Sequence, residues 1–213
     1  ATWHKEAKDG GPQVFYLAGF AGTGKTTLAK HIAESVDGDV CFAAFTGKAA
    51  LMMRSKGCKG ASTIHSLIYA AEEDEHGIIR YSLNSNSALE DASLAIIDEC
   101  SMVDEKLGRD LLSFGKPVLV IGDPAQLPPV SGTGFFTSSE PNFLLTEVHR
   151  QARDNPIIRL SMDVREGRTL SKGTYGCSQI LSRSALTRNE VLAADQVIVG
   201  RNATRQVINS KIR

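Results

Sequence analysis

The most chemically informative stretch of the sequence is a glycine-rich turn that ends in lysine and threonine. Residues 19–26 fit the pattern G-x-x-x-x-G-K-[ST] at every fixed position, between an apolar run and a segment with helical periodicity. Backbone N–H groups in such a turn, together with the helix N-terminus behind it, attract phosphate oxygens. We expect Lys25 to reach the β- and γ-phosphates of a nucleotide and Thr26 to hold Mg²⁺. The predicted phosphate-binding set is Gly22, Thr23, Gly24, Lys25, Thr26 and Thr27.

A pair of carboxylates follows a second apolar run. Asp98 and Glu99 come directly after Leu94–Ile97, where the end of a buried strand is expected. Phosphoryl transfer needs charge neutralisation and a positioned nucleophile more than covalent help. We expect Asp98 to complete the Mg²⁺ site and Glu99 to orient and deprotonate the attacking water as catalytic base.

Two further segments carry groups suited to a γ-phosphate. Gln126 lies in the proline-rich stretch 122–130, whose fixed φ angles hold the loop rigid, so that its amide can donate to a phosphate oxygen. Arg150 follows the apolar run 143–145 and is a candidate for the cation that stabilises charge on that phosphate. Both residues are therefore predicted to act in catalysis.

A third group of residues has the chemistry of a phosphodiester contact. Residues 45–50 and 62–66 offer hydroxyls, backbone N–H groups and a cation. The same residue types are equally typical of helix N-caps, so composition alone leaves both readings open.

The elements that position these groups follow from the apolar periodicity. Strand-like runs at 14–18, 40–45, 94–97, 118–121 and 143–145 alternate with helical or loop segments. That alternation predicts an α/β fold with a parallel sheet flanked by helices. Because ligand sites in such sheets lie at the carboxyl ends of the strands, the polar segments are expected to converge at one edge.

The pattern changes in two places. Between about 70 and 90 an acidic run and a weakly alternating stretch predict a small inserted hairpin. Residues 1–150 are expected to form one domain, and 151–213 to comprise a helix from Asn155 to Gly167, an irregular polar connection over 168–190, a strand over 195–200 and a helix over 204–211 with Val207 and Ile208 inward. The isolated last strand and helix, and a helix remnant at residues 3–8, lead us to expect a fragment of a longer protein.

Composition is that of an ordinary soluble protein. The chain has 213 residues, 42% hydrophobic and 23% charged, with zero formal net charge. No apolar run approaches a membrane span and no signal-peptide core is present, which favours a soluble cytoplasmic protein with no membrane partner. The spacing of the four cysteines indicates neither zinc nor a disulfide framework. Neutral charge argues against a large nucleic-acid surface but not against a narrow channel.

Taken together, the segments resemble the superfamily 1 helicases of the 5′→3′ branch, which include RecD-like and Dda-like enzymes. The resemblance covers nearly the whole chain, and its most specific part is D-E-x-S-M-V-D at 98–104 followed by G-D-x-x-Q-L-P-P-V at 122–130. It implies a RecA-like P-loop domain that uses ATP and Mg²⁺, with Gln126 and Arg150 as γ-phosphate sensors. It also implies a partial second RecA-like domain from about residue 195. The residues implied to face single-stranded DNA are Thr46, Lys48, Thr63 and His65.

Two alternatives remain open at this level. Another P-loop ATPase, such as a loader or packaging motor, uses the same loop and carboxylates, although the proline-rich loop of Gln126 disfavours it. A nucleotide- or DNA-binding module without unwinding activity is the other. The sequence does not separate DNA from RNA, nor does it identify replication, repair or recombination proteins as partners.

Overall fold

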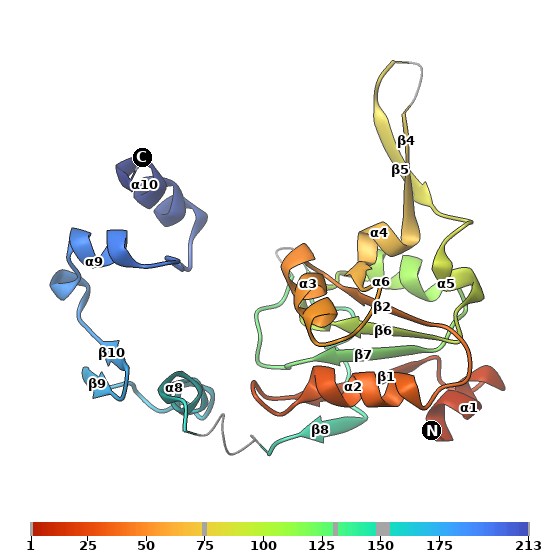
Figure 1. Ribbon diagram of the computed structural model, residues 1–213, viewed down its shortest axis with the longest axis horizontal. Helices are drawn as coiled ribbons and strands as arrows, with labels where there is room; N and C mark the ends of the chain where they lie inside the picture. The colour runs from red at the N-terminus through yellow and green to blue at the C-terminus, as the bar shows by residue number, and fades with distance from the viewer. Residues whose placement is uncertain (1, 74–75, 130–131, 148–153, 213) are drawn as a thin grey trace. The chain divides into compact units, whose positions relative to one another are not determined.

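The computed structural model describes residues 2–73, 76–129, 132–147 and 154–212. The chain divides into two units, Ala1–Arg153 and Asp154–Arg213, and each is described by itself (Figure 1). Among the described helices, none combines the length and the apolar character that a membrane crossing requires.

The first unit is built on a parallel sheet. Its six strands lie in the order β3-β2-β6-β7-β1-β8. All five pairings between neighbours are parallel, which confirms the predicted sheet. The strands are β1 (Val14–Gly19), β2 (Val40–Ala44), β3 (Ser62–Thr63), β6 (Leu94–Asp98), β7 (Val118–Gly122) and β8 (Phe143–Leu145).

Helices cover both faces of this sheet because successive strand residues point to opposite sides. Leu17, Ile96 and Ile121 pack on one face with Ala29 of α2, whereas Tyr16, Ile97 and Val120 pack on the other. Each buried isoleucine contributes about 1.5–3 kcal/mol relative to exposure. The first face carries α1 (Thr2–Lys8), α2 (Lys25–Glu34) and α3 (Gly47–Ser55), and the second carries α4 (Ile64–Ile68), α5 (Ala88–Asp91), the 3-10 turn η1 (Cys100–Met102) and α6 (Glu105–Leu112).

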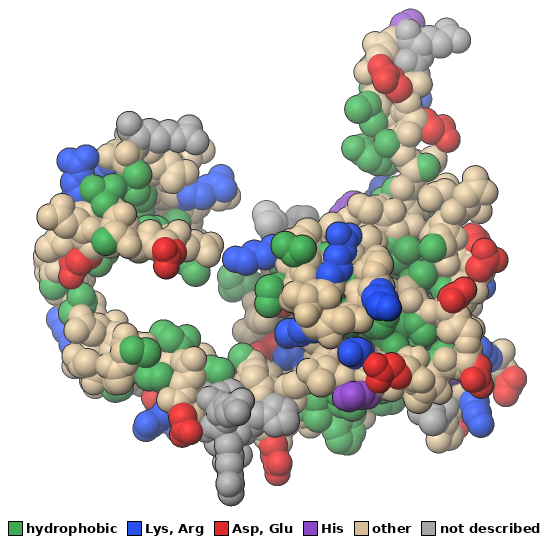
Figure 2. All heavy atoms as spheres, viewed as in Figure 1, with side chains coloured by type: hydrophobic (Ala, Val, Ile, Leu, Met, Phe, Trp, Pro, Cys, Tyr) green, Lys and Arg blue, Asp and Glu red, His purple; other side chains and the backbone are tan. Residues whose placement is uncertain are grey.

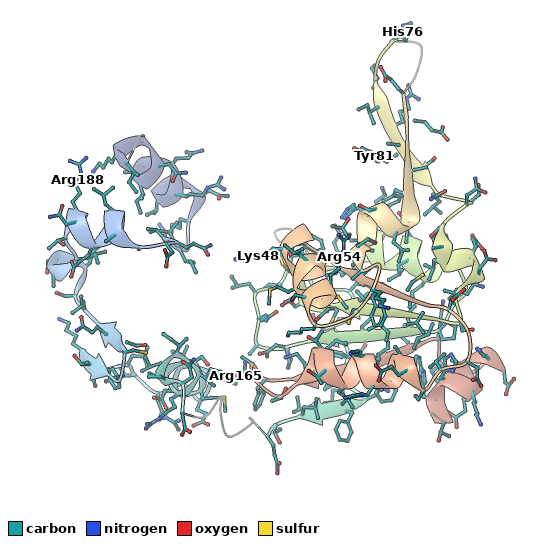
Figure 3. The ribbon with its side chains drawn as sticks, in the orientation of Figure 1. Lys48, Arg54, His76, Tyr81, Arg165 and Arg188 are labelled. Atoms are coloured by element: carbon teal, nitrogen blue, oxygen red, sulfur yellow. The ribbon has the colours of Figure 1, made fainter. Side chains whose placement is uncertain are left out.

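The predicted insertion is a hairpin of two antiparallel strands, β4 (Tyr69–Glu73) and β5 (Ile79–Leu83), which forms a sheet of its own. It projects from the body of the unit (Figure 1). Tyr81 extends from β5 and is 72% exposed (Figure 3). Among the described residues of the hairpin, only Tyr69, at the base of β4, packs against the core of the unit, whereas β5 is exposed along its length.

The second unit is small, and two predictions for it were wrong. Residues 195–200 form no strand, and Ile198 there is 84% exposed, because no described segment of the unit pairs with them. The connection 168–190 is not irregular throughout, since it contains a short hairpin and the start of a helix. The elements are α8 (Pro156–Arg165), β9 (Gly173–Tyr175), β10 (Ser178–Ile180), η2 (Arg183–Ala185), α9 (Arg188–Ala193) and α10 (Asn202–Ile212).

Both helices predicted for this unit form. Asn155 caps α8 by accepting from the N–H of Ile157, and Gly167 follows the helix with a φ of 73°, as the sequence predicted. The last helix also forms, but Val207 is 51% exposed rather than inward.

Candidate nucleotide-binding site

The phosphate loop joins β1 to α2. Gly22 and Gly24 both have φ of 79°, in the left-handed region that favours glycine, and Gly24 is the residue before α2. Thr23 is buried, and its hydroxyl donates to the Phe20 carbonyl at 2.8 Å. A side chain at Gly19 would place its Cβ 2.8 Å from the Thr23 hydroxyl. The local sequence thus folds the loop back on itself.

Lys25 lies within the curl of this loop. Its ammonium group donates to the carbonyls of Gly19 at 2.8 Å and Phe20 at 3.0 Å. A cation held at the centre of the loop, in front of a helix N-terminus, is placed to meet anionic oxygens. Thr26, the next residue, lies on the first turn of α2.

Thr26 contacts the end of β6. Its hydroxyl donates to Asp98 Oδ2 at 3.0 Å, which puts one hydroxyl and one carboxylate together. The described residues contain no group of three His, Cys, Asp or Glu side chains able to hold a metal. One carboxylate and one hydroxyl suit Mg²⁺, which commonly keeps several waters and shares its remaining positions with substrate phosphates. The donor set fits a metal that arrives with a nucleotide.

Glu99 follows Asp98 in an unusual backbone conformation. With φ of 58° it is the only non-glycine residue of the described chain that has positive φ. This turn lets the Glu99 N–H donate to Asp98 Oδ1 at 2.9 Å. Left-handed residues of this kind cost roughly 1 kcal/mol or more and often occur at functional sites. The strain therefore supports a functional role for the side chain that it orients.

The electrostatic surroundings of Glu99 oppose its ionisation. Burial is the largest cause that raises the pKa of its carboxyl, with further contributions from Asp98 and Asp123. Lys25 and a side-chain hydrogen bond with Gln126 act in the opposite direction. A carboxylate with a raised pKa is a stronger proton acceptor, which suits a general base.

Gln126 reaches Glu99 from the loop after β7. Its Oε1 accepts from the Ser101 hydroxyl at 3.3 Å, so its side chain lies between Ser101 and Glu99. The backbone N–H of Gln126 donates to the Asp123 carbonyl at 3.0 Å, and Asp123 Oδ1 accepts from the Ala125 N–H at 3.0 Å. Asp123 thereby fixes the turn that presents Gln126.

These groups line one pocket of about 670 Å³. It extends from the phosphate loop past Asp98 and Glu99 to α3. The lining residues are Ala21, Gly22, Gly24, Lys25, Thr26, Thr27, Thr46, Lys48, Ala49, Met52, Met53, Lys56, Asp98, Glu99, Met102 and Gln126. Five of the six residues predicted to bind phosphate belong to it, and Thr23 lies beneath the loop instead.

The four residues implied to face DNA divide into two groups. Thr46 and Lys48 line the pocket, whereas Thr63 at the end of β3 and His65 in α4 are not among its lining residues. Thr46 and Thr63 also accept from the N–H groups of Ala49 and Ser66 as helix N-caps. The capping role that the sequence left open is therefore real, although it does not exclude a ligand. The His65 ring meets Phe45 edge to face and lies tilted against Tyr69.

Sequence reasoning missed three residues near the site. Asp123 is a carboxylate that is only 2% exposed, and Ser101 is a buried hydroxyl that contacts Gln126. Cys100 packs against Gly122, where an added Cβ would lie 2.6 Å from its sulfur. Burial raises the pKa of the Cys100 thiol to about 12, which keeps it protonated. An aspartate directly after a buried strand was a signal for Asp123.

The Gln13 amide donates to the carbonyls of Leu112 and Lys116, both at 2.9 Å, so this side chain joins the start of β1 to the segment before β7. Gln13 therefore stabilises the fold of the first unit. Arg150 lies outside the described residues, and its role stays a prediction.

The fold and the pocket define a RecA-like P-loop nucleotide-binding domain. Residues 4–179 match the protein family described as AAA domain. The chain belongs to this family, and the resemblance to superfamily 1 DNA helicases predicted from the motifs is confirmed by its relatives.

Similarity extends to characterised helicases. The ATP-dependent RecD2 DNA helicase of Deinococcus radiodurans is 36% identical over 169 residues, which cover 74% of this chain and 22% of that protein. The ATP-dependent DNA helicase Dda of Enterobacteria phage T4 is 34% identical over 167 residues, 71% of this chain and 38% of that protein. The structure of Bacteroides Pif1 bound to single-stranded DNA is 25% identical, with a TM-score of 0.54. The match covers 78% of this chain and 46% of that chain. The chain thus spans less than half of each.

Proposed function

We propose that this chain is the nucleotide-binding motor domain of an ATP-driven DNA helicase that moves 5′→3′ along single-stranded DNA. The observation that carries the proposal is the single pocket in which Lys25, Asp98, Glu99 and Gln126 converge. The relatives named above are ATP-dependent DNA helicases, and one similar structure holds single-stranded DNA, which supports the same function here. We also propose that the protein is soluble and cytoplasmic.

Nucleotide binding follows from the loop and its neighbours. The N–H groups of the loop and the Lys25 ammonium would bind the β- and γ-phosphates in place of the carbonyl contacts that Lys25 makes now. Thr26 and Asp98 would hold Mg²⁺, which neutralises charge on the phosphate oxygens when bound. Both groups already lie 3.0 Å apart, so little rearrangement is required.

Hydrolysis would use Glu99 as the proton acceptor. Its carboxylate takes a proton from water as the water oxygen bonds to the γ-phosphorus, and the bond from that phosphorus to the bridging oxygen breaks, leaving ADP and inorganic phosphate. Gln126 would hold the γ-phosphate and report its presence to the proline-rich loop. Arg150 is proposed, from the family resemblance, to add positive charge at the same phosphate.

Coupling to DNA would run through β2, which is next to β6, and through β3, which pairs with β2. Thr46 and Lys48 follow β2, Thr63 is the last residue of β3 and His65 follows it, so all four lie at or beyond the carboxyl ends of two paired parallel strands. We propose that they contact the DNA backbone. We propose that unit 154–213 comprises a connection and the start of a second RecA-like domain, which closes on DNA when ATP binds.

The test compares two lysines of α2. Lys25→Ala should weaken binding of a fluorescent ATP analogue to this chain and abolish DNA-stimulated ATPase of the full-length protein. Lys30→Ala is the matched control, because Lys30 lies on the same helix and pairs with Glu34 at 3.7 Å outside the pocket. Retained turnover in the Lys25 variant would contradict the site assignment.

Direction is tested separately. The full-length protein should unwind a duplex that carries a 5′ single-stranded tail and leave a duplex with a 3′ tail intact. A matched pair of RNA tails decides the nucleic-acid preference. ATPase without any unwinding would favour the loader or packaging class instead.

A further inference from the structure

The pocket continues beyond the catalytic carboxylate, into a groove between two helices. Thr26 and Thr27 of α2 line one side, and Met52 and Met53 of α3 line the other. Lys56, the C-cap residue that follows α3, also belongs to the lining. This part of the pocket lies beyond the residues of the phosphate loop.

The order of the strands determines what lies along this groove. Because β7 and β6 separate β1 from β2, the carboxyl edge carries the phosphate loop, then Gln126, then Glu99, and then the start of α3. A γ-phosphate held by Lys25 therefore has Glu99 on the side that faces α3. The attacking water must approach from the side opposite the leaving group, and the cleaved phosphate is then left on that side.

The far side of the groove is basic. Lys and Arg side chains gather over α3 and the adjoining part of α2 (Figure 2), and Lys48 and Arg54 lie on α3 (Figure 3). Among the described residues, neither Lys48 nor Lys56 forms an ion pair. The buried Cys58 packs in a cluster with Met53 of α3; burial chiefly raises the pKa of its thiol, Asp98 adds to that effect, and Lys30 and Lys56 oppose it.

We propose that the groove between α2 and α3 is a binding site for the inorganic phosphate that hydrolysis releases, with Lys56 as its principal cation. Asp98 and Glu99 repel a phosphate dianion once the bond is cleaved, while Lys56 attracts it from the same continuous pocket. The inference rests on the proposed ATPase function and adds the place that the product occupies before it leaves.

The test measures phosphate binding directly. Titration of inorganic phosphate into the full-length protein saturated with Mg²⁺ and ADP should show about fivefold weaker affinity in Lys56→Gln, the size expected for one exposed charge. Lys56→Arg should retain most of the affinity. Lys59→Gln is the control, because Lys59 is exposed, carries the same charge and does not line the pocket.

Product inhibition gives the second readout. Inhibition of the ATPase by inorganic phosphate should weaken by the same factor in Lys56→Gln and stay unchanged in Lys59→Gln. Equal phosphate affinity in Lys56→Gln and Lys59→Gln would overturn the proposal, and so would a loss of affinity for single-stranded DNA with phosphate affinity intact. If the unaltered protein hydrolyses no ATP, the proposed function fails. The phosphate titration still tests whether the groove between α2 and α3 binds phosphate.

Discussion

Thr26 and Asp98 are 72 positions apart in the sequence, and the Thr26 hydroxyl donates to Asp98 Oδ2 at 3.0 Å in the folded chain. This contact joins the first turn of α2 to the end of β6. The fold of the sheet thus brings together the hydroxyl and the carboxylate that we propose to hold Mg²⁺.

Asp98→Asn should show whether Mg²⁺ binding needs the negative charge of Asp98 or only the shape of its side chain. The amide is nearly isosteric and can still accept from Thr26, but it lacks the negative charge that a hard cation prefers. We expect Mg²⁺-dependent ADP binding to weaken by about tenfold or more, and binding in EDTA to change little. Titration of a fluorescent ADP analogue in both conditions measures this.

The control for that change is Asp91→Asn, which removes the same charge from an exposed position at the end of α5. Equal losses in the two variants would mean that only net charge matters.

Glu99→Gln should alter stability in a pH-dependent way. Burial raises the pKa of Glu99 in the folded state, so the ionised carboxylate opposes folding. Below the ordinary glutamate pKa both states carry the proton and the cost is absent; it grows as pH rises through the raised folded-state pKa and is complete above it. The variant should therefore melt at a higher temperature than the unaltered chain near pH 7.

Thermal melts across pH test this sign. The difference should shrink toward zero near about pH 4, where Glu99 is protonated in both states. A constant difference at all pH values would point to packing instead of ionisation.

Gly122→Ala should destabilise the first unit by about 1–3 kcal/mol. The new Cβ would lie 2.6 Å from the Cys100 sulfur, in a site where both residues are buried. Urea denaturation measures the loss. Adding Cys100→Ala removes the sulfur and should recover part of it, and Gly47→Ala, whose Cβ would meet nothing within 4 Å, should cost little.

Gln13→Leu should weaken the fold without changing nucleotide selectivity. The substitution leaves the carbonyls of Leu112 and Lys116 without the amide that now donates to both, which costs about 1–3 kcal/mol when such groups are left unsatisfied. We expect a lower urea midpoint and the same preference for ATP over GTP. A changed preference would instead assign Gln13 a contact with the nucleotide base.

Much of the fold was predictable because its signals are local. The run 143–145 corresponds to β8 residue for residue, and the other four predicted strands begin at the observed residues and end within one residue of the observed ends. Apolar runs bounded by turns identify buried strands of a parallel sheet. The segment 195–200 has the same composition but no described partner, and without pairing it forms no strand. Strand formation depends on a neighbour that a local pattern does not contain.

The sequence by itself determined the chemistry of the site: a loop whose glycines adopt left-handed φ, a lysine and a threonine at its end, and two carboxylates after an apolar strand. These depend on backbone conformation and residue type within a few positions. Only the tertiary structure decided which groups meet. The strand order places Glu99 between the phosphate loop and α3, buries Asp123 beneath Gln126 and makes Lys56 part of the pocket. These placements join strands that are far apart in the sequence and linked by crossover connections. The order of those strands is set by the packing of the whole sheet.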